Sequence, residues 1–421
     1  MRAQLFLFAQ VFVGFLTAGE LRAAPLSWQA SVAEALEANS DVRAANEKLR
    51  AAEYATQGSY SAFFPQLNAS LTYTRTKGVD TFNLADPVNR YGATLSASQN
   101  LFNGFQDRAR VDQARASREA AEASAASAKA KASYDLKSAY AGLLYAQRSV
   151  LLQGEIERRR GDNLRLVELR FNSGRENKGS VLLSRAYLRQ ARHETLQAQN
   201  AARTSLAHLA RVLGWNGPRE VELSEEVPSA ASLEQLDFRA MSLQTPDRRQ
   251  ALAQEASSAA GVALARGAFF PTLGLDGSRG RQGTTWFPAN DRWSFGVTLS
   301  LPLFSGGRDY YATRGAAATS AAATITREGV DREQVAKLEQ TYAAFLEARS
   351  KVEVEEAFLE AAKTRSEIAR NKYNNGLSSF DDWDLIENDL IQRQKSVLLG
   401  RRERVIAEAA YEQAQGKGVL P

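Results

Sequence analysis

The chain has 421 residues, 44% of them hydrophobic, and a formal net charge of only +5. It contains 10 prolines and no cysteine, which excludes a disulfide framework, a thiolate metal site and a cysteine nucleophile. Arg and Lys are interleaved with Asp and Glu along the whole chain, which argues against a nucleic-acid-binding surface. The scarcity of proline leaves long stretches free to form uninterrupted helices.

The amino terminus has the pattern of a secretory signal. Arg2 precedes an apolar run at residues 5–16, and small residues follow around Gly19 and Ala23. The run is much shorter than the ~20 residues that a membrane-spanning helix needs. We therefore expect residues 1–23 to be a signal peptide, the mature protein to be exported, and any membrane insertion to be made by strands.

Helical sequence at residues 31–62 precedes two segments in which apolar and polar residues alternate. The apolar positions of the first are Leu67, Ala69, Leu71 and Tyr73, and those of the second are Tyr91, Ala93, Leu95, Ala97 and Leu101. A period of two indicates strands. Alternation over about ten residues is typical of a transmembrane barrel with lipid outside and water inside, and a soluble sandwich or hairpin pair is the alternative.

A very long helix is expected next. Residues 105–172 contain no proline, which at 1.5 Å per residue gives a helix of ~100 Å. Gly174 breaks it, and residues 176–213 return for only ~57 Å. The missing length matches the ~48 Å of residues 31–62, so we expect that helix to stack end to end with the returning one.

The second half repeats this order of elements. A stacking helix is expected at residues 247–267, a weak strand around Leu273 and Leu275, a glycine-rich loop at residues 277–283, and a strand of alternating apolar residues from Trp293 to Leu301. Helices at 308–374 and 378–415 follow, with a break at Gly376.

Both long helices carry a seam of mostly apolar residues at strict sevens, which favours a coiled coil over an ordinary bundle helix. The positions are Leu338, Phe345, Val352, Leu359, Ser366 and Tyr373 in the second half, and Leu136, Leu143, Val150, Glu157, Leu164 and Phe171 in the first.

Short motifs recur in the two halves, about 202 residues apart. Phe63-Phe64-Pro65 recurs as Phe269-Phe270-Pro271, Leu101-Phe102-Asn103-Gly104 as Leu303-Phe304-Ser305-Gly306, and Arg170-Phe171-Asn172-Ser173-Gly174 as Lys372-Tyr373-Asn374-Asn375-Gly376. This period is too long for a solenoid and predicts two copies of one large unit. We expect a first repeat at 24–215, a linker or equatorial segment at 216–240, and a second repeat at 241–421.

These features together resemble the TolC family of outer-membrane efflux and secretion channels. The resemblance covers nearly all of the mature chain and depends on the duplication, the Phe-Phe-Pro motifs, the motif of residues 302–307 and the hinge at residues 373–377. It implies an α+β membrane protein of a Gram-negative outer membrane: a trimeric, 12-stranded barrel continued by a periplasmic α-helical barrel that meets an adaptor protein and an inner-membrane transporter.

The residues also predict an oligomer independently of the resemblance. Four strands cannot close a barrel, and unpaired backbone in lipid is costly. Two chains would give an eight-stranded barrel, whose interior is filled by side chains. Three chains would give twelve strands and leave a conduit. We therefore expect a homotrimer that acts as a passive, gated duct and not as an enzyme, with no cofactor, metal site or nucleic-acid partner. The alternative is a non-conducting coiled-coil scaffold.

An acidic cluster follows the second hinge, where the gate is expected because these turns are farthest from the membrane. Its members are Asp381, Asp382, Asp384, Glu387 and Asp389, and the first four are the candidate gate residues. The resemblance implies that Asp382, six residues after the hinge glycine, helps form an acidic ring at the periplasmic entrance. The second ring position of the family is Leu385 here, so a second ring is expected only if Asp384 or Glu387 takes its place. Complementing the helix dipole is the simpler role for such carboxylates.

The two turns themselves are the expected adaptor contacts, as the resemblance implies. Gly376-Leu377 matches the family pattern, and Gly174-Arg175 departs from it by replacing the leucine. A glycine that ends a helix needs no partner to explain it.

Basic and aromatic residues gather where the outer loops are expected, and they would meet outer-membrane lipid and lipopolysaccharide phosphates, or merely solvate the loops. They are Arg75, Lys77, Arg90, Arg279, Arg281, Trp286, Phe287 and Arg292.

Overall fold

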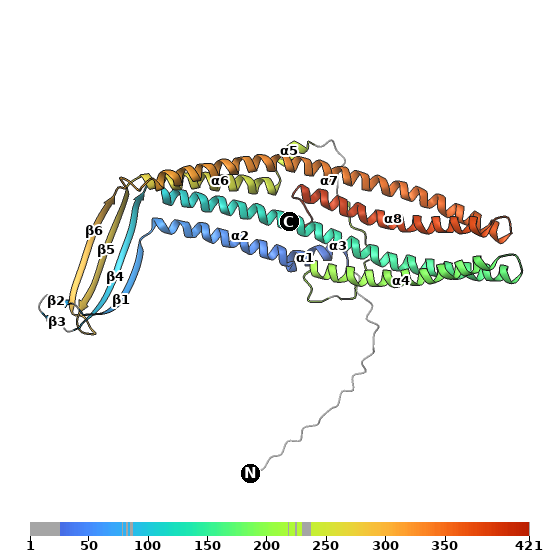
Figure 1. Ribbon diagram of the computed structural model, residues 1–421, viewed down its shortest axis with the longest axis horizontal. Helices are drawn as coiled ribbons and strands as arrows, with labels where there is room; N and C mark the ends of the chain where they lie inside the picture. The colour runs from blue at the N-terminus through green and yellow to red at the C-terminus, as the bar shows by residue number, and fades with distance from the viewer. Residues whose placement is uncertain are drawn as a thin grey trace, which may run out of the picture.

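The computed structural model describes residues 26–77, 79–80, 83–84, 87–217, 219–223, 225–229 and 237–420. The predicted signal peptide at residues 1–23 lies outside the described residues. The molecule is elongated: a sheet lies at one end, and helices run from it to two turns at the other end (Figure 1). No helix in the described part of the chain combines the length and hydrophobicity needed to cross a membrane.

The first half of the chain runs out to the sheet, along the whole molecule and part of the way back. Its elements are α1 (Trp28–Ala38), α2 (Ser40–Ser59), the 3-10 helix η1 (Tyr60–Phe63), β1 (Gln66–Thr76), β2 (Val79–Asp80), β3 (Asn83–Leu84), β4 (Val88–Asn103), α3 (Gln106–Asn172) and α4 (Lys178–Val212).

The second half repeats this path without the β2–β3 hairpin. Its elements are α5 (Phe238–Ser242), α6 (Pro246–Arg266), the 3-10 helix η2 (Gly267–Phe269), β5 (Thr272–Gly283), β6 (Asn290–Ser300), α7 (Arg308–Asn374) and α8 (Phe380–Ala414). The two long helices have 67 residues each and the two returning helices 35 each. The predictions for all four are confirmed to within two residues at each end.

The single helix predicted at residues 31–62 is wrong, because the chain breaks at Asn39. The Asn39 side chain accepts hydrogen bonds from the backbone N–H groups of Asp41 and Val42, at 3.0 and 3.1 Å, and so caps α2. Its amide nitrogen donates to the carbonyl oxygen of Val212, the last residue of α4, at 2.8 Å. One side chain thus joins the end of α4 to the start of α2, and the predicted end-to-end stacking is confirmed.

The junction between α4 and α2 requires a glycine, because two backbone segments approach closely there. Gly214 has a φ of 72°, and a Cβ placed there would lie 2.4 Å from the carbonyl oxygen of Ala38. The second half has the same arrangement, since Gly416 has a φ of 72° and a Cβ there would lie 2.1 Å from Pro246 Cδ. Both stacked junctions therefore require a residue without a side chain.

The sheet joins the two halves of the chain. It is antiparallel with the order β1-β4-β5-β6, so that β4 of the first half pairs with β5 of the second. The glycine-rich segment at 277–283, predicted as a loop, forms the outer half of β5, and Arg75, Arg90, Arg279, Arg281 and Arg292 lie in strands. A Cβ at Gly280 would lie 2.3 Å from the Ala93 carbonyl oxygen, so the glycine allows β4 to approach.

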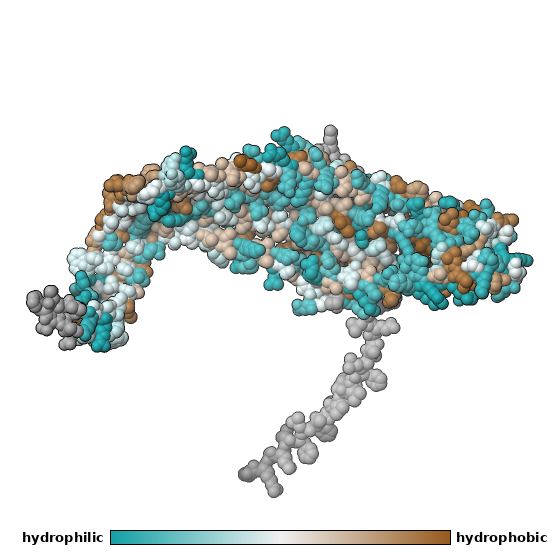
Figure 2. Space-filling model, in the orientation of Figure 1, coloured by the Kyte–Doolittle hydropathy of each residue, from teal (hydrophilic) through white to brown (hydrophobic). Residues whose placement is uncertain are grey.

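One face of the sheet is apolar over most of its area. Directly paired residues share a face, and the pairs Leu67–Ala97, Leu71–Ala93 and Leu275–Val297 place apolar side chains on it. Several of these side chains are exposed in the single chain; Leu71, for example, is 87% exposed. Figure 2 shows many hydrophilic residues along the helices, with hydrophobic ones gathered where the sheet meets the helices and again toward the far end.

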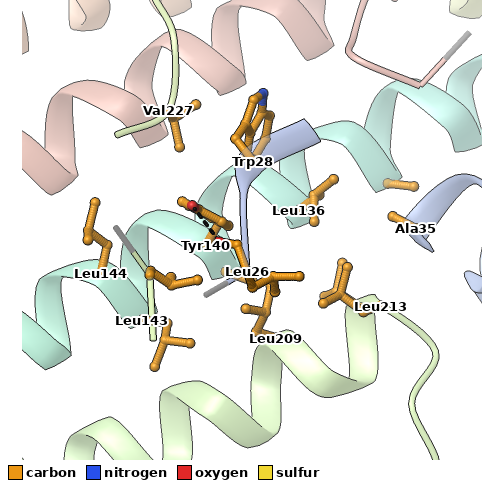
Figure 3. Packing of buried hydrophobic residues seen from close by; sticks show 14 of the residues in the cluster. Leu26, Trp28, Ala35, Leu136, Tyr140, Leu143, Leu144, Leu209, Leu213 and Val227 are labelled. Atoms are coloured by element: carbon orange, nitrogen blue, oxygen red, sulfur yellow. Dashed lines mark hydrogen bonds between the residues drawn. The ribbon is translucent and has the colours of Figure 1, made fainter. Parts of the chain in front are cut away.

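The largest hydrophobic core surrounds the middle of α3, where α1, α4 and the chain end converge. Leu136, Tyr140 and Leu143 of α3 are almost fully buried against Leu209 and Trp28 (Figure 3). The rings of Trp28 and Tyr140 meet edge to face, with centroids 5.2 Å apart. This core holds the shaft at its equator, far from both the sheet and the tips.

The heptad seams differ between the halves. In the second half the predicted seam is buried at Leu338, Phe345, Val352, Ser366 and Tyr373. In the first half Leu136 and Leu143 are buried, but Phe171 is exposed, and burial passes instead to Ile156 and Val167. The stripe that α3 buries near its far end therefore differs from the predicted one, whereas α7 keeps its seam as far as Tyr373.

Candidate functional site at the helix tips

The two turns at the far end of the shaft have the same backbone geometry. In the α3–α4 turn Arg175 N–H donates to the Arg170 carbonyl at 2.8 Å, and in the α7–α8 turn Leu377 N–H donates to the Lys372 carbonyl at 2.8 Å. Gly174 and Gly376 adopt φ values of 73° and 74°. This is the glycine stop that ends many helices. It accounts for both glycines by conformation alone, because a Cβ at either would meet nothing within 4 Å.

The predicted adaptor contacts lie at the extreme end of the molecule. Arg175 is exposed, and the Leu377 side chain is 75% exposed. An apolar side chain left in solvent at a helix tip contributes nothing to the core of its own chain. The surface offered here therefore consists of one apolar side chain and one cation on neighbouring turns.

The four predicted gate carboxylates do not form one cluster. Asp381 and Asp382 are exposed, whereas Asp384 is largely buried and Glu387 is almost completely buried, at 2% exposure. Asp382 belongs to the cap of α8: its N–H donates to Ser379 Oγ at 3.1 Å, and the Ser379 hydroxyl donates to its carboxylate at 2.6 Å. Asp382 therefore both caps the helix and presents its charge to solvent.

Asp384 and Glu387 point inward, toward the first half of the chain. Arg160 of α3 donates to the Asp384 carboxylate at 3.4 Å and also bonds Asn388. The Arg160 guanidinium lies over the Tyr187 ring of α4, 4.5 Å from its centroid. Because both charged groups of this pair are largely buried, each is the main neutralising partner of the other.

Glu387 is buried between α3, α7 and α8. Its carboxylate accepts hydrogen bonds from Arg159 and Asn163 of α3, both at 3.5 Å, and a short one from Ser366 of α7. A buried carboxylate needs such donors to offset its loss of water. Glu387 is thus a fixed link between the two hairpins in the single chain.

A third contact joins the hairpins closest to the tips. Tyr373 is completely buried and stacks on Trp383, with ring centroids 4.4 Å apart and planes 12° apart. Its hydroxyl donates to Glu176 Oε2 at 2.8 Å, and Arg170 lies over its other face, 4.4 Å from the centroid. Burial, together with the hydrogen bond to Glu176, raises the pKa of the Tyr373 phenol above its usual range.

Sequence reasoning missed most of the partners in these contacts. Arg160, Asn163, Arg170 and Glu176 belong to the first half and lie about 200 residues from the groups that they contact. The one available signal was the seven-residue repeat, which ends on Tyr373. Nothing in the sequence pattern indicated that Asp384 and Glu387 turn inward while Asp381 and Asp382 stay in solvent.

The sheet with one apolar face, the paired long helices and the glycine-stopped tips have counterparts among known proteins. The family model described as outer membrane efflux protein matches residues 32–215 and 240–417. The chain belongs to this family. The predicted resemblance to TolC-like channels is confirmed, and with it an outer-membrane location in which the shaft extends into the periplasm. Members of the family are transport channels.

Two sequence relatives and one solved structure are distant in sequence but match most of the chain. SilC of Salmonella typhimurium, described as a probable outer membrane lipoprotein, is 22% identical over 92% of this chain and 85% of its own. AprF of Pseudomonas aeruginosa, an alkaline protease secretion protein, is 24% identical over 82% of this chain and 71% of its own. The crystal structure of the outer membrane protein VceC of Vibrio cholerae superposes with a TM-score of 0.81 at 21% identity, covering 93% of this chain and 96% of that one.

Proposed function

We propose that this protein is the outer-membrane exit duct of a tripartite efflux pump or a type I secretion system. The main support for this proposal is that the two ends of the molecule have different structures. A sheet with one apolar face lies at one end, and a pair of interlocked helical hairpins ends ~100 Å away, the length of one 67-residue helix. Such a chain reaches from the outer membrane far into the periplasm, and cargo passes through it without chemistry.

Closing the duct requires more than one chain. In the four-stranded sheet, β1 and β6 are edge strands with unpaired backbone groups on one side. Within a membrane those groups need partners. Three chains supply twelve strands, which is enough for a water-filled interior, whereas eight strands are filled by side chains. A homotrimer with a 12-stranded barrel follows.

The repeated halves indicate how the shaft closes. At the tip end of the shaft the helices lie in the order α7, α8, α3, α4 (Figure 1), with α3 packed on α8 and the outer faces of α7 and α4 free in the single chain. Leu144 of α3 and Leu398 of α8 line one cavity at their contact. The positions 202 residues away, Leu346 of α7 and Leu196 of α4, are exposed at 38% and 54%. In the trimer α7 of one protomer packs on α4 of the next, as α3 packs on α8.

Absence of cysteine makes this arrangement testable by cross-linking. The double variant Leu196→Cys/Leu346→Cys is expected to form disulfides between chains and to migrate as a covalent trimer under non-reducing denaturation. The matched pair Leu144→Cys/Leu398→Cys lies at the equivalent contact within one chain and is expected to cross-link without changing the apparent mass. A monomer from the first pair, together with a monomer in detergent, would contradict the trimer.

The gate is formed by the contacts that hold the two hairpins together at their tips. The Tyr373–Glu176 hydrogen bond, the Arg160–Asp384 ion pair and the buried Glu387 each join the second hairpin to the first. Opening the entrance requires one hairpin to swing from the other, which breaks these contacts. They are polar, so water can replace the partners that each group loses when the tips separate.

Asp382 and Asp381 are the carboxylates available to line the entrance. Both are exposed in the first turn of α8, and three chains bring three copies of each to one axis. A ring of carboxylates attracts cations and raises their local concentration. Asp384 and Glu387 act differently, because their charges are already satisfied within the chain.

The tips also provide the docking surface for a periplasmic adaptor, which links the duct to an inner-membrane transporter. Leu377 is exposed and apolar, and Gly174, Arg175 and Gly376 shape the adjoining turns. Alternating positions around the trimer would offer the adaptor two kinds of tip, one with Leu377 and one with Arg175. The transporter selects the cargo, which this chain does not encode.

A further inference from the structure

The two halves of the sheet end differently at the edge that faces away from the helices. On the apolar face Tyr73 of β1 pairs directly with Tyr91 of β4, and their rings lie 5.0 Å apart. The Phe-Phe-Pro motifs align β1 with β5 at a spacing of 206, which places Arg279 where the first half has Tyr73. Trp293 of β6 stands 202 residues after Tyr91, and Arg279 pairs directly with Trp293. A Tyr–Tyr pair in one half is thus an Arg–Trp pair in the other.

The position of Arg279 relative to the membrane follows from the length of its strand. Arg279 lies nine positions after Phe270, which is at the helical end of the sheet. At ~3.4 Å per residue and a strand tilt of ~40°, this spans roughly 23 Å along the membrane normal. That is close to the ~25 Å height of the apolar band of an outer-membrane barrel, which aromatic residues flank on both sides. Arg279 therefore lies at the outer edge of the band, among interfacial aromatic side chains.

Arg279 is the first cation along β5, counted from the helical end of the sheet, on the face that turns mostly apolar side chains to lipid. Its two direct cross-strand neighbours are Trp293, which is 80% exposed, and Leu95, which is 56% exposed. Arg281, the next residue on this face, forms an ion pair with Asp291 at 2.9 Å, whereas none of the described side chains forms an ion pair or hydrogen bond with Arg279. Its charge is therefore free to meet a ligand from the lipid side.

We propose that Arg279, supported by Trp293, binds a phosphate group of a lipopolysaccharide molecule in the outer leaflet. The guanidinium offers planar paired donors that match phosphate oxygens, and the binding is strengthened by partial exclusion of water. Trp293 supports the acyl-chain end of the same molecule as an interfacial aromatic residue. The inference rests on the proposed function only in taking the apolar face of the sheet to be its lipid face.

The first half of the sheet has a pair of tyrosines, and no arginine, at the positions that match Arg279 and Trp293. Tyr73 and Tyr91 complete an aromatic edge without any cation, so the barrel does not need an arginine at this level in order to insert. Arg292, although grouped in the sequence with the residues expected to meet lipopolysaccharide, lies next to Trp293 on the opposite, polar face, where its side chain donates to Gln282 at 2.7 Å. It is therefore the matched control. It carries the same charge at the same height, directed to the interior.

The test uses the full-length protein purified in detergent and titrated with lipid A, the phosphorylated anchor of lipopolysaccharide, with bound lipid counted by native mass spectrometry. Arg279→Gln and Arg279→Tyr are expected to weaken lipid A binding by about tenfold, Arg279→Lys to weaken it less, and Arg292→Gln to leave it unchanged. Lipid A from which the phosphates have been removed is expected to bind the wild-type protein as weakly as intact lipid A binds Arg279→Gln.

Three results would overturn the proposal: unchanged binding in Arg279→Gln, an equal loss in Arg292→Gln, or full competition by inorganic phosphate at millimolar concentration, which would indicate a site for free anions. Each variant is also reconstituted in planar bilayers. A variant with normal conductance and altered lipid A binding would show that the lipid site is independent of conduction. If the wild-type protein itself conducts no current, the proposed duct is contradicted, but the lipid A result still stands.

Discussion

The hydroxyl group of Tyr373 donates a 2.8 Å hydrogen bond to Glu176, and this bond joins the last turn of α7 to the turn after α3 across 197 residues of chain. It lies at the tips, where the two hairpins must separate if the entrance is to open. Tyr373→Phe is expected to retain the stacking on Trp383 and lose only this bond. The result should be a leakier channel, seen as faster uptake of a large hydrophilic antibiotic by cells that produce the variant. Ser173→Ala, in the exposed turn, is the control, and equal uptake in both would contradict the role of the bond.

The pKa of Tyr373 sets the pH range over which the phenol can donate this bond. Burial and Glu176 raise the pKa of Tyr373 above the usual 10.0 of tyrosine. Since the pKa is raised in the folded state, the stabilisation is fully present below the unfolded pKa and is lost as pH rises through the folded one. Conductance through the wild-type channel is therefore expected not to increase through ionisation of Tyr373 between pH 7 and 10. An increase in that window that Tyr373→Phe abolishes would be inconsistent with a protonated, bonded phenol.

The Arg160–Asp384 pair is expected to behave as one unit. Because the two side chains are only 8% and 13% exposed, removing one partner leaves the other charge without its counterion. Arg160→Gln and Asp384→Asn should each lower the free energy of unfolding by about 3 kcal/mol, measured by denaturant titration with circular dichroism. The double variant should lose less than the sum of the two. Strict additivity would show that the pair makes no specific contribution.

Asp382 is expected to control cation access to the entrance. Asp382→Asn retains an oxygen that can accept from Ser379 and removes the charge, so the helix cap is preserved. In planar bilayers it should weaken block by divalent or trivalent cations added on the periplasmic side and alter conductance. Asp41→Asn, a carboxylate in the first turn of α2 at the equator, should leave block unchanged. Wild-type block in Asp382→Asn would remove Asp382 from the proposed ring.

Gly174 and Gly214 have nearly equal backbone angles but different surroundings. Comparing their alanine variants therefore distinguishes the cost of backbone strain from the cost of a steric clash. Gly174 and Gly214 have φ values of 73° and 72°, but a Cβ at Gly174 meets nothing within 4 Å, whereas one at Gly214 would lie 2.4 Å from the Ala38 carbonyl oxygen. Gly174→Ala should cost about 1 kcal/mol of stability, from backbone conformation alone. Gly214→Ala should cost clearly more, because the junction between α4 and α2 must also open. Equal shifts in thermal unfolding would contradict the close stacking of these helices.

Most of the architecture could be predicted because it is encoded locally. The limits of α7 were predicted at residues 308–374, where Gly307 and Gly376 flank a long stretch without proline, and the structure has the same limits. The break at Asn39 was missed although asparagine is a preferred helix cap, because its decisive partner is the distant Val212 carbonyl. The strand at residues 277–283 was missed because its glycines, read as a loop signal, allow close packing on β4.

The tip site was only partly predictable, because its contacts also come from residues distant in the sequence. Charge and position in the chain identified the carboxylates after Gly376, but whether each faces solvent or protein depends on the rotation of α8 against α3. Trp383 packs beneath Tyr373, and this contact turns Asp384 and Glu387 inward. Single-sequence patterns carry no information about that pairing, since the partners come from the other half of the chain.

Single-channel recording in planar bilayers tests conduction itself most directly. Purified trimers should produce discrete conductance steps, small in the wild type and larger in Tyr373→Phe/Arg160→Gln, where two of the contacts between the hairpins are removed. Stable trimers of this double variant that insert into the bilayer and carry no current would contradict the duct and favour a non-conducting envelope scaffold.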